Sequence, residues 1–238
     1  MSRSEEHLFE LLKDCIPDDH SQQVSPTFFI DKLYEQGSGG RKVLDLGCGR
    51  GTSADLFRRR DPDVEWHGAD VQPPPDFDAR KRSGQHFHLI DGVTLPFEDA
   101  SFDIVLSVQV FEHVRHPETL LAELGRVLVG GGAFIGSVSY LEPYHSFSYW
   151  NYTPFGWHTL LTEAGLSVVE FRPGIDAIAL IQRQYLGLPR KAECWFKRSP
   201  LNKEIDAWGA KTRQSHARIN LRKLQYCGHL AFYAVRSR

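Results

Sequence analysis

Apolar positions along this chain form short runs that are separated by segments with helical spacing. Runs of this kind are typical of buried strands, and the spacing between them is typical of amphipathic helices. The expected strands cover 42–46, 64–70, 86–90, 102–107, 133–139, 166–172 and 229–235, and the expected helices cover 4–14, 26–36, 52–59, 116–128 and 154–165. This alternation favours an α/β fold with a mainly parallel sheet and helices on both faces.

A long segment separates the last two expected strands. Patches at 176–187 and 211–225 have helical patterns. A tight connection would need far fewer residues, so we interpret the segment as a helical insertion that covers the site. We expect one domain over 1–238, made of a helical N-terminal cap (1–40), a core (41–172), the insertion (174–228) and a terminal strand (229–236).

The composition is that of an ordinary globular protein, with 41% hydrophobic and 24% charged residues. No apolar run reaches the roughly 18 residues of a membrane helix, and residues 1–14 lack the apolar centre of a signal peptide. The cysteines, Cys15, Cys48, Cys194 and Cys227, form no C-x-x-C pair. We therefore expect a cytoplasmic protein that is not held in a membrane.

The charge is distributed unevenly. The net charge of −2 gives no global basic field that would attract nucleic acid. Between Arg183 and Lys223, however, eleven Lys and Arg residues stand against three acids. This run is either a solvated helical face or a surface that attracts an anionic substrate, such as a phosphorylated glycan.

A glycine-rich turn follows the first expected strand. Asp45 is followed by Gly47, Gly49 and Gly51 at alternate positions. Glycine permits a left-handed turn and lets a ligand lie against bare backbone. The dinucleotide pattern G-x-G-x-x-G would need a glycine at Thr52, and a P-loop would need a lysine after its last glycine. Neither phosphate-binding loop therefore fits.

The next expected strand ends in a second acid, Asp70. A carboxylate roughly 20 residues beyond a glycine turn can bind both ribose hydroxyls of an adenosine, although such an acid can also cap a turn. Asp45 is placed to bind an ammonium group, directly or through a water. The turn resembles the S-adenosylmethionine (SAM) loop of the class I methyltransferases.

Further motifs extend this resemblance over roughly residues 40–172. H-L-I-D-G-V-T-L-P-F (88–97), S-F-D-I-V-L-S (101–107) and F-E-H-V (111–114) follow the loop, and E-L-G-R-V-L (123–128) stands just before three glycines. As a set, they resemble the small-molecule, methyltransferase-11-like class I enzymes. The resemblance implies a Rossmann-like sheet of seven strands, mostly parallel with an antiparallel last strand, and a helical N-terminus over the cofactor.

The resemblance also assigns cofactor-binding roles to single residues. Val71 would pack on the adenine face, Asp91 would accept from the adenine amino group, and Gly92 would donate its backbone N–H to the ring. Ser107 would offer its backbone carbonyl to the methionine ammonium. The implied cofactor-binding residues are Asp45, Gly47, Gly49, Gly51, Asp70, Val71, Asp91, Gly92 and Ser107.

The loop at 140–154 is rich in aromatic residues and contains His145. Ligands of open α/β sheets bind beyond the carboxyl ends of the strands, and rings with polar groups suit sugar faces. The loop also resembles that of methyltransferases from polysaccharide and glycan-modifying pathways. The expected substrate contacts are Tyr144, Tyr149, Trp150 and Tyr152. Alternatively, these aromatics pack on the insertion.

Two histidines are candidates for the base that a hydroxyl acceptor benefits from. His145 is the first candidate, as base or as a substrate-orienting group, and His113 is its rival. In some relatives a Glu-x-x-Glu-His motif at His113 binds a divalent metal. Here Gln109 replaces the first acid, and hard cations prefer charged oxygen ligands, so we expect no metal.

Together these features predict a SAM-dependent methyltransferase that acts on a hydroxyl group of a small molecule, such as a sugar, glycan or natural product. N-methylation of an amine remains an alternative. RNA methylation is a further alternative, although the chain carries no appended RNA-binding motif and no overall basic charge. A non-catalytic SAM-binding protein would carry the same glycine loop.

Overall fold

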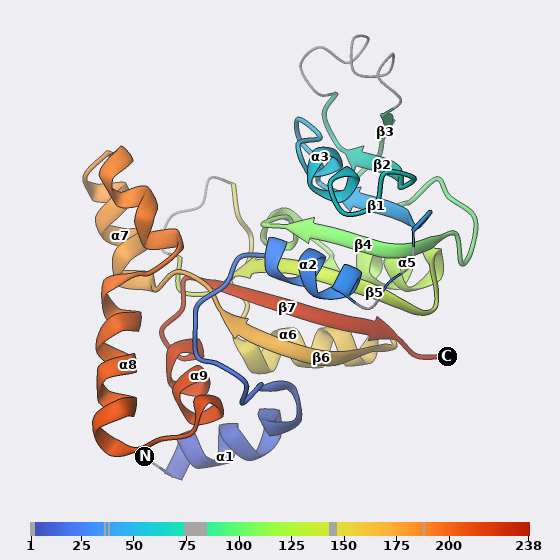
Figure 1. The fold of residues 1–238 in the computed structure, drawn as a ribbon. Helices are drawn as coiled ribbons and strands as arrows, with labels where there is room; N and C mark the ends of the chain where they lie inside the picture. Colours follow the sequence, from blue (N-terminus) through green and yellow to red (C-terminus); the bar gives the residue numbers. More distant parts are fainter. Residues whose placement is uncertain (1–2, 36, 38, 74–84, 143–146, 188) are drawn as a thin grey trace.

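The chain folds around one sheet (Figure 1). The computed structural model describes residues 3–35, 37, 39–73, 85–142, 147–187 and 189–238. Within these ranges the sheet has seven strands in the order β3-β2-β1-β4-β5-β7-β6. The strands are β1 (Lys42–Leu46), β2 (Glu65–Asp70), β3 (His86–Leu89), β4 (Phe102–Val108), β5 (Leu128–Ser139), β6 (Leu166–Pro173) and β7 (His229–Arg236). Strands β1 to β5 pair in parallel, and β7 runs antiparallel to β5 and β6, so the expected fold is confirmed.

Helices cover both faces of the sheet. The helices are α1 (Arg3–Leu12), α2 (Thr27–Glu35), α3 (Ser53–Arg58), α5 (Pro117–Val127), α6 (Pro154–Glu163), α7 (Ala177–Tyr185), α8 (Pro200–Thr212) and α9 (His216–Leu224), with the 3-10 turns η1 (Lys13–Cys15), η2 (Phe111–His113) and η3 (Arg190–Phe196). Successive strand residues face opposite sides. Val43 therefore packs in one core with α2 and α3, and Leu44 packs in the other with α5 and α6. In the described part of the chain, no helix is long and apolar enough to span a membrane.

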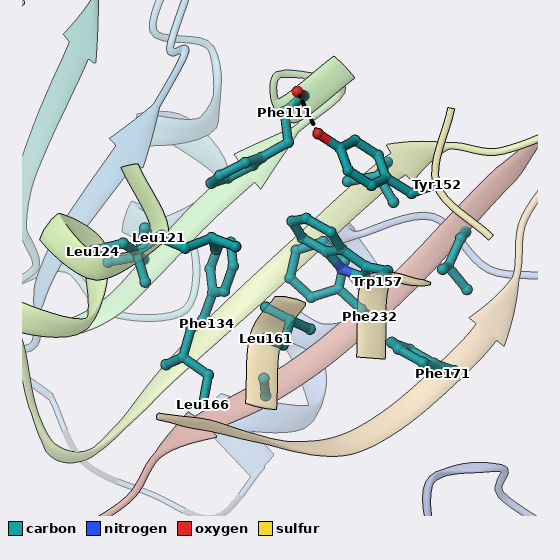
Figure 2. Close-up of a cluster of buried hydrophobic side chains, with 14 of the residues drawn as sticks. Phe111, Leu121, Leu124, Phe134, Tyr152, Trp157, Leu161, Leu166, Phe171 and Phe232 are labelled. Carbon is teal, nitrogen blue, oxygen red and sulfur yellow. Dashed lines mark hydrogen bonds between the residues drawn. The ribbon is translucent and has the colours of Figure 1, made fainter. Parts of the chain in front are cut away.

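The core on the α5 and α6 side contains a cluster of buried aromatic side chains (Figure 2). Trp157 of α6 lies 4.9 Å from the ring of Tyr152, 5.1 Å from Phe111 and 5.3 Å from Phe232. The Tyr152 hydroxyl donates to the Phe111 carbonyl oxygen at 2.9 Å, as a buried tyrosine requires. Tyr152 was predicted to contact the substrate; in the structure its side chain is buried and packs in this core.

The insertion between β6 and β7 contains more helix than the sequence predicts. The expected patch at 211–225 is in fact interrupted, because α8 ends before Arg213, which has a left-handed backbone (φ 53°). Ser215 then caps α9 by accepting from the backbone N–H of Arg218 at 3.3 Å. Figure 1 shows α8 and α9 side by side near the β6 edge of the sheet.

A buried arginine attaches the N-terminal segment to β6. The Arg172 guanidinium is 0% exposed and donates to both carboxylate oxygens of Asp19, at 2.9 and 2.7 Å. It also donates to Glu170, which binds Lys32 of α2, and it lies 4.8 Å from the Phe28 ring centroid. Burial raises the pKa of Asp19, but the hydrogen bonds from Arg172 and from the His20 backbone, together with the Arg172 charge, lower the pKa to about 2.

We expect Arg172→Met to reduce the free energy of unfolding by about 3 kcal/mol, because Glu170 and Asp19 would lose their shared cation. Urea unfolding followed by circular dichroism would measure the change. Arg59→Met removes an exposed arginine and should alter stability by less than about 0.5 kcal/mol. Equal losses in the two variants would contradict the role given to Arg172.

Candidate functional site

The turn after β1 has a backbone that only glycine adopts readily. Gly47, Gly49 and Gly51 have φ values of 71°, 48° and 69°, all in the left-handed region. A Cβ on Gly47 would lie 2.3 Å from Val110 Cγ2, and one on Gly51 would lie 2.6 Å from Phe87 Cζ. Both conformation and space therefore require glycine at these two positions.

Asp70 holds this turn in place from the end of β2. Its Oδ2 accepts from the backbone N–H of Gly49 at 2.8 Å, and its Oδ1 accepts from that of Gln72 at 3.2 Å. The Gly47 N–H donates to the Ala69 carbonyl at 2.7 Å. Each carboxylate oxygen can accept more than one hydrogen bond, so Asp70 can still accept from two ligand hydroxyls.

Asp45 lies on the other side of the turn and is almost fully buried, with 5% of its surface exposed. The Ser53 hydroxyl donates to its carboxylate, and Trp66 Nε1 donates to that hydroxyl at 3.0 Å. Burial raises the pKa of Asp45 to about 7, although the hydrogen bond from Ser53 lowers it. A cationic ligand group would therefore find an acid that ionises near neutral pH.

Two cavities meet at Gly47, which lines both of them. The first has a volume of about 280 Å³ and the second about 350 Å³. The predicted residues that line the first are Gly47, Asp70, Val71, Asp91, Gly92, His113 and Tyr149. Asp45 lines the second, together with Ser25 and Thr27 of the N-terminal segment. An elongated ligand could therefore reach Asp70 with one end and Asp45 with the other.

The far wall of the first cavity is a tight turn after β3. Asp91 Oδ1 accepts from the backbone N–H groups of Thr94 at 2.6 Å and Val93 at 2.8 Å. These two hydrogen bonds lower the pKa of Asp91 and keep it a hydrogen-bond acceptor. Gly92 has a left-handed backbone (φ 85°), and a Cβ there would lie 3.3 Å from Val71, whose side chain is 57% exposed.

Ser107 was predicted to offer its backbone carbonyl to the methionine ammonium, but in the structure this carbonyl faces the neighbouring strand. A Cβ on Gly136 would lie 1.8 Å from the Ser107 carbonyl oxygen, so this oxygen lies against β5. Ser107 itself is 1% exposed. From β4 it is Leu106 and Val108 that line the second cavity. Both are apolar, and their side chains point to the face opposite that of Ser107.

A cluster of polar side chains, which we call the strand-end cluster, lies where β4 and β5 end and β7 begins. Ser139 Oγ is 2.8 Å from Gln109 Oε1, 2.9 Å from Glu112 Oε1 and 2.7 Å from Glu142 Oε2. His229 Nε2 lies 3.2 Å from Glu142 Oε2. Ser139 has one hydroxyl hydrogen, so it can donate to only one of these three oxygens.

Strand register places this cluster on the face that carries the second cavity. Val108, which lines that cavity, pairs with Ser137, and Ser139 pairs with His229. Paired residues of neighbouring strands share a face, and so do residues two apart on one strand. Glu142 and His229 could not be predicted as partners from the sequence, because no local motif joins them.

The other predicted residues lie beside the first cavity. His113 ends η2 and lines this cavity together with Tyr149. The Tyr149 N–H donates to the Glu112 carbonyl at 2.7 Å, and Trp150 Nε1 donates to the Val114 carbonyl at 3.0 Å. The side chains of Tyr149 and Trp150 are 61% and 48% exposed, so both rings are open to a ligand.

Two predicted residues, His145 and Tyr144, lie outside the described residues. Within the described ranges, no group of three or more His, Cys, Asp or Glu side chains could hold a metal ion. Gln109, which replaces the first acid of the metal motif, uses its amide on Ser137 and Ser139. That the protein needs no metal remains a prediction.

Comparison with known proteins agrees with this geometry. Residues 44–136 match the family model described as a methyltransferase domain. A phthiotriol/phenolphthiotriol dimycocerosates methyltransferase from Mycobacterium tuberculosis is 36% identical over 99 residues, which cover 40% of this chain and 37% of that protein. A demethylmenaquinone methyltransferase from Thermus thermophilus is 35% identical over 100 residues, which cover 40% of this chain and 46% of that protein. The chain thus spans less than half the length of these relatives.

The fold is shared with a solved methyltransferase from Burkholderia thailandensis, 1,6-didemethyltoxoflavin-N1-methyltransferase, which was crystallised with S-adenosylhomocysteine. The two structures superpose with a TM-score of 0.59 at 17% identity, over 90% of this chain and 77% of the other. The fold, the glycine turn and the match of residues 44–136 to a methyltransferase domain all agree with the resemblance to the class I SAM-dependent methyltransferases. The cofactor of this class is S-adenosylmethionine.

The pKa of Asp45 leads to a prediction about cofactor binding. An ammonium group beside Asp45 favours the carboxylate, so binding below pH 7 must release a proton. We expect the Kd for S-adenosylhomocysteine to rise by up to about tenfold for each pH unit below about 7. Calorimetric titrations at several pH values would measure it. Asp45→Asn should bind more weakly and with little pH dependence in this range, and a flat profile for the native protein would refute the assignment.

Proposed function

We propose that this protein transfers the methyl group of S-adenosylmethionine to a hydroxyl group of a small molecule of the sugar or natural-product class. The observation that carries the proposal is the pair of cavities that meet at Gly47, with Asp70 in one and Asp45 in the other. The first acid suits ribose hydroxyls and the second suits an ammonium group. The match of residues 44–136 to a methyltransferase domain supports methyl transfer.

When bound, S-adenosylmethionine supplies an electrophilic methyl group on sulfur. The chain's own residues then have to bind, orient and exclude water. Asp70 would accept hydrogen bonds from the ribose, and Asp45 would hold the ammonium group. Leu106 and Val108 give the cavity that contains Asp45 an apolar wall. The strand-end cluster lies on the same face of the sheet as this wall.

The strand-end cluster supports a hydroxyl acceptor, because such an acceptor benefits from a base to take its proton. In the described part of the chain, His229 Nδ1 has no hydrogen-bond partner, whereas Nε2 faces Glu142. If Nε2–H donates to Glu142, then Nδ1 carries the lone pair that accepts the proton. The exposed rings of Tyr149 and Trp150 offer surfaces for stacking a sugar or flat acceptor.

The first test of the proposal is calorimetric titration with S-adenosylhomocysteine. The native protein should bind with a Kd in the range of about 1–100 μM, and Asp70→Ala should weaken binding at least about 100-fold, because it removes a charged acceptor from the ribose. Asp63→Ala, an exposed acid of the loop before β2, should bind like the native protein. A native protein that does not bind would remove the basis for methyl transfer.

The base can be identified by alanine variants of His229, His145 and His113, assayed with an acceptor found by screening. We expect His229→Ala to reduce kcat by about 10²- to 10⁴-fold while the Kd for S-adenosylhomocysteine stays unchanged. The exposed His7→Ala serves as the control. Full activity in His229→Ala, with loss in His145→Ala or His113→Ala, would assign the base to one of the residues predicted from the sequence.

A further inference from the structure

A third cavity, with a volume of about 500 Å³, lies between the N-terminal segment and the insertion. Gln22 and Gln23 form one wall, before α2. The other wall comes from the insertion, and its residues are Lys197, Arg198, Asn202, Asp206 and Lys223. The cavity shares no lining residue with the two beside the glycine turn, and methyl transfer does not account for its exposed cations.

The charges around this cavity do not cancel. Lys223 is 1% exposed, and its Nζ lies 2.6 Å from Asp206 Oδ1 and 2.5 Å from the Ser21 carbonyl oxygen, so it neutralises the single acid. Lys197 and Arg198 are exposed at the rim, and neither forms an ion pair within the described ranges. Two positive charges therefore remain for a ligand.

A buried amide adds a hydrogen-bond acceptor to the same wall. Asn202 is 2% exposed, and its Nδ2 donates to Gln23 Oε1 at 2.8 Å and to the Gly174 carbonyl at 3.0 Å. The opposite orientation would set Oδ1 against these two oxygens, so the amide is fixed. Asn202 Oδ1 is buried and has no donor within the described part of the chain. This oxygen is shut off from solvent, so a ligand hydroxyl can reach it only if the cavity wall around Asn202 moves, and the contact would then remove the cost of leaving it unpaired.

We propose that this third cavity binds a small phosphorylated polyol. Lys197 and Arg198 would bind the phosphate through charge-assisted hydrogen bonds, for which a guanidinium is well suited. Asn202 Oδ1 would accept from a hydroxyl of the polyol. This function is additional to methyl transfer and does not depend on it.

Calorimetric titration of the full chain with inorganic phosphate, glucose 6-phosphate and neutral glucose tests the proposal. Phosphate should bind, glucose 6-phosphate should bind more tightly, and glucose should not bind. The double variant Lys197→Ala/Arg198→Ala should weaken binding of glucose 6-phosphate at least about tenfold. The control Lys203→Ala/Lys211→Ala removes the same charge from exposed positions on α8 that do not line the cavity, and it should bind normally.

Each other result has a definite meaning. Absence of phosphate binding by the native protein, or equal weakening in both double variants, would overturn the site. Equal affinity for phosphate and glucose 6-phosphate would overturn the polyol part. A titration with S-adenosylhomocysteine separates this proposal from methyl transfer, because Lys197→Ala/Arg198→Ala should bind it like the native protein. If the native protein binds phosphate but not S-adenosylhomocysteine, the methyl-transfer proposal is contradicted and the proposal for the third cavity stands.

Discussion

The left-handed turn after β1 is the constraint on which the rest of the site depends. With Gly47 at φ 71°, the chain leaves the strand without a side chain between the two cavities. The Gly47 N–H binds the Ala69 carbonyl, and the Gly49 N–H binds Asp70, so the turn and the end of β2 hold each other in position. The cofactor path is therefore built from backbone, and only glycine keeps it open.

Asp45 shows that this part of the site is not arranged for stability alone. An acid that is almost fully buried stabilises a fold poorly, because burial disfavours its charged form. Ser53 and Trp66 hold the carboxylate in place with a short chain of hydrogen bonds, yet its pKa stays near neutral. A group with a pKa this far from its ordinary value is typical of functional sites. A cationic ligand group would supply the positive charge that the protein itself does not place beside the Asp45 carboxylate.

The sequence predicted the parts of the structure that depend on neighbouring residues. Strand β1 has the expected bounds, and β5 begins earlier, at Leu128, because Leu128 already pairs with Phe102; the pairing is irregular across the glycines that follow, where Gly131 has a left-handed backbone (φ 81°). The break at Arg213 could not be predicted, since no glycine or proline marks it. The strand-end cluster was missed for another reason. Ser139 and His229 meet only through the pairing of β5 with β7, and such pairing is not a local property of the sequence.

The insertion also shapes the cofactor site, although the two are far apart in sequence. The Gln23 amide donates to the carbonyls of Trp195 and Phe196 at 2.9 and 3.0 Å and accepts from Ser199 N at 2.8 Å. Two residues later, Ser25 lines the cavity that contains Asp45. The insertion thus fixes the segment that closes this cavity, and the same segment forms one wall of the third cavity. A substitution in the insertion should therefore change cofactor binding through Gln23, without direct contact between the substituted residue and the glycine turn.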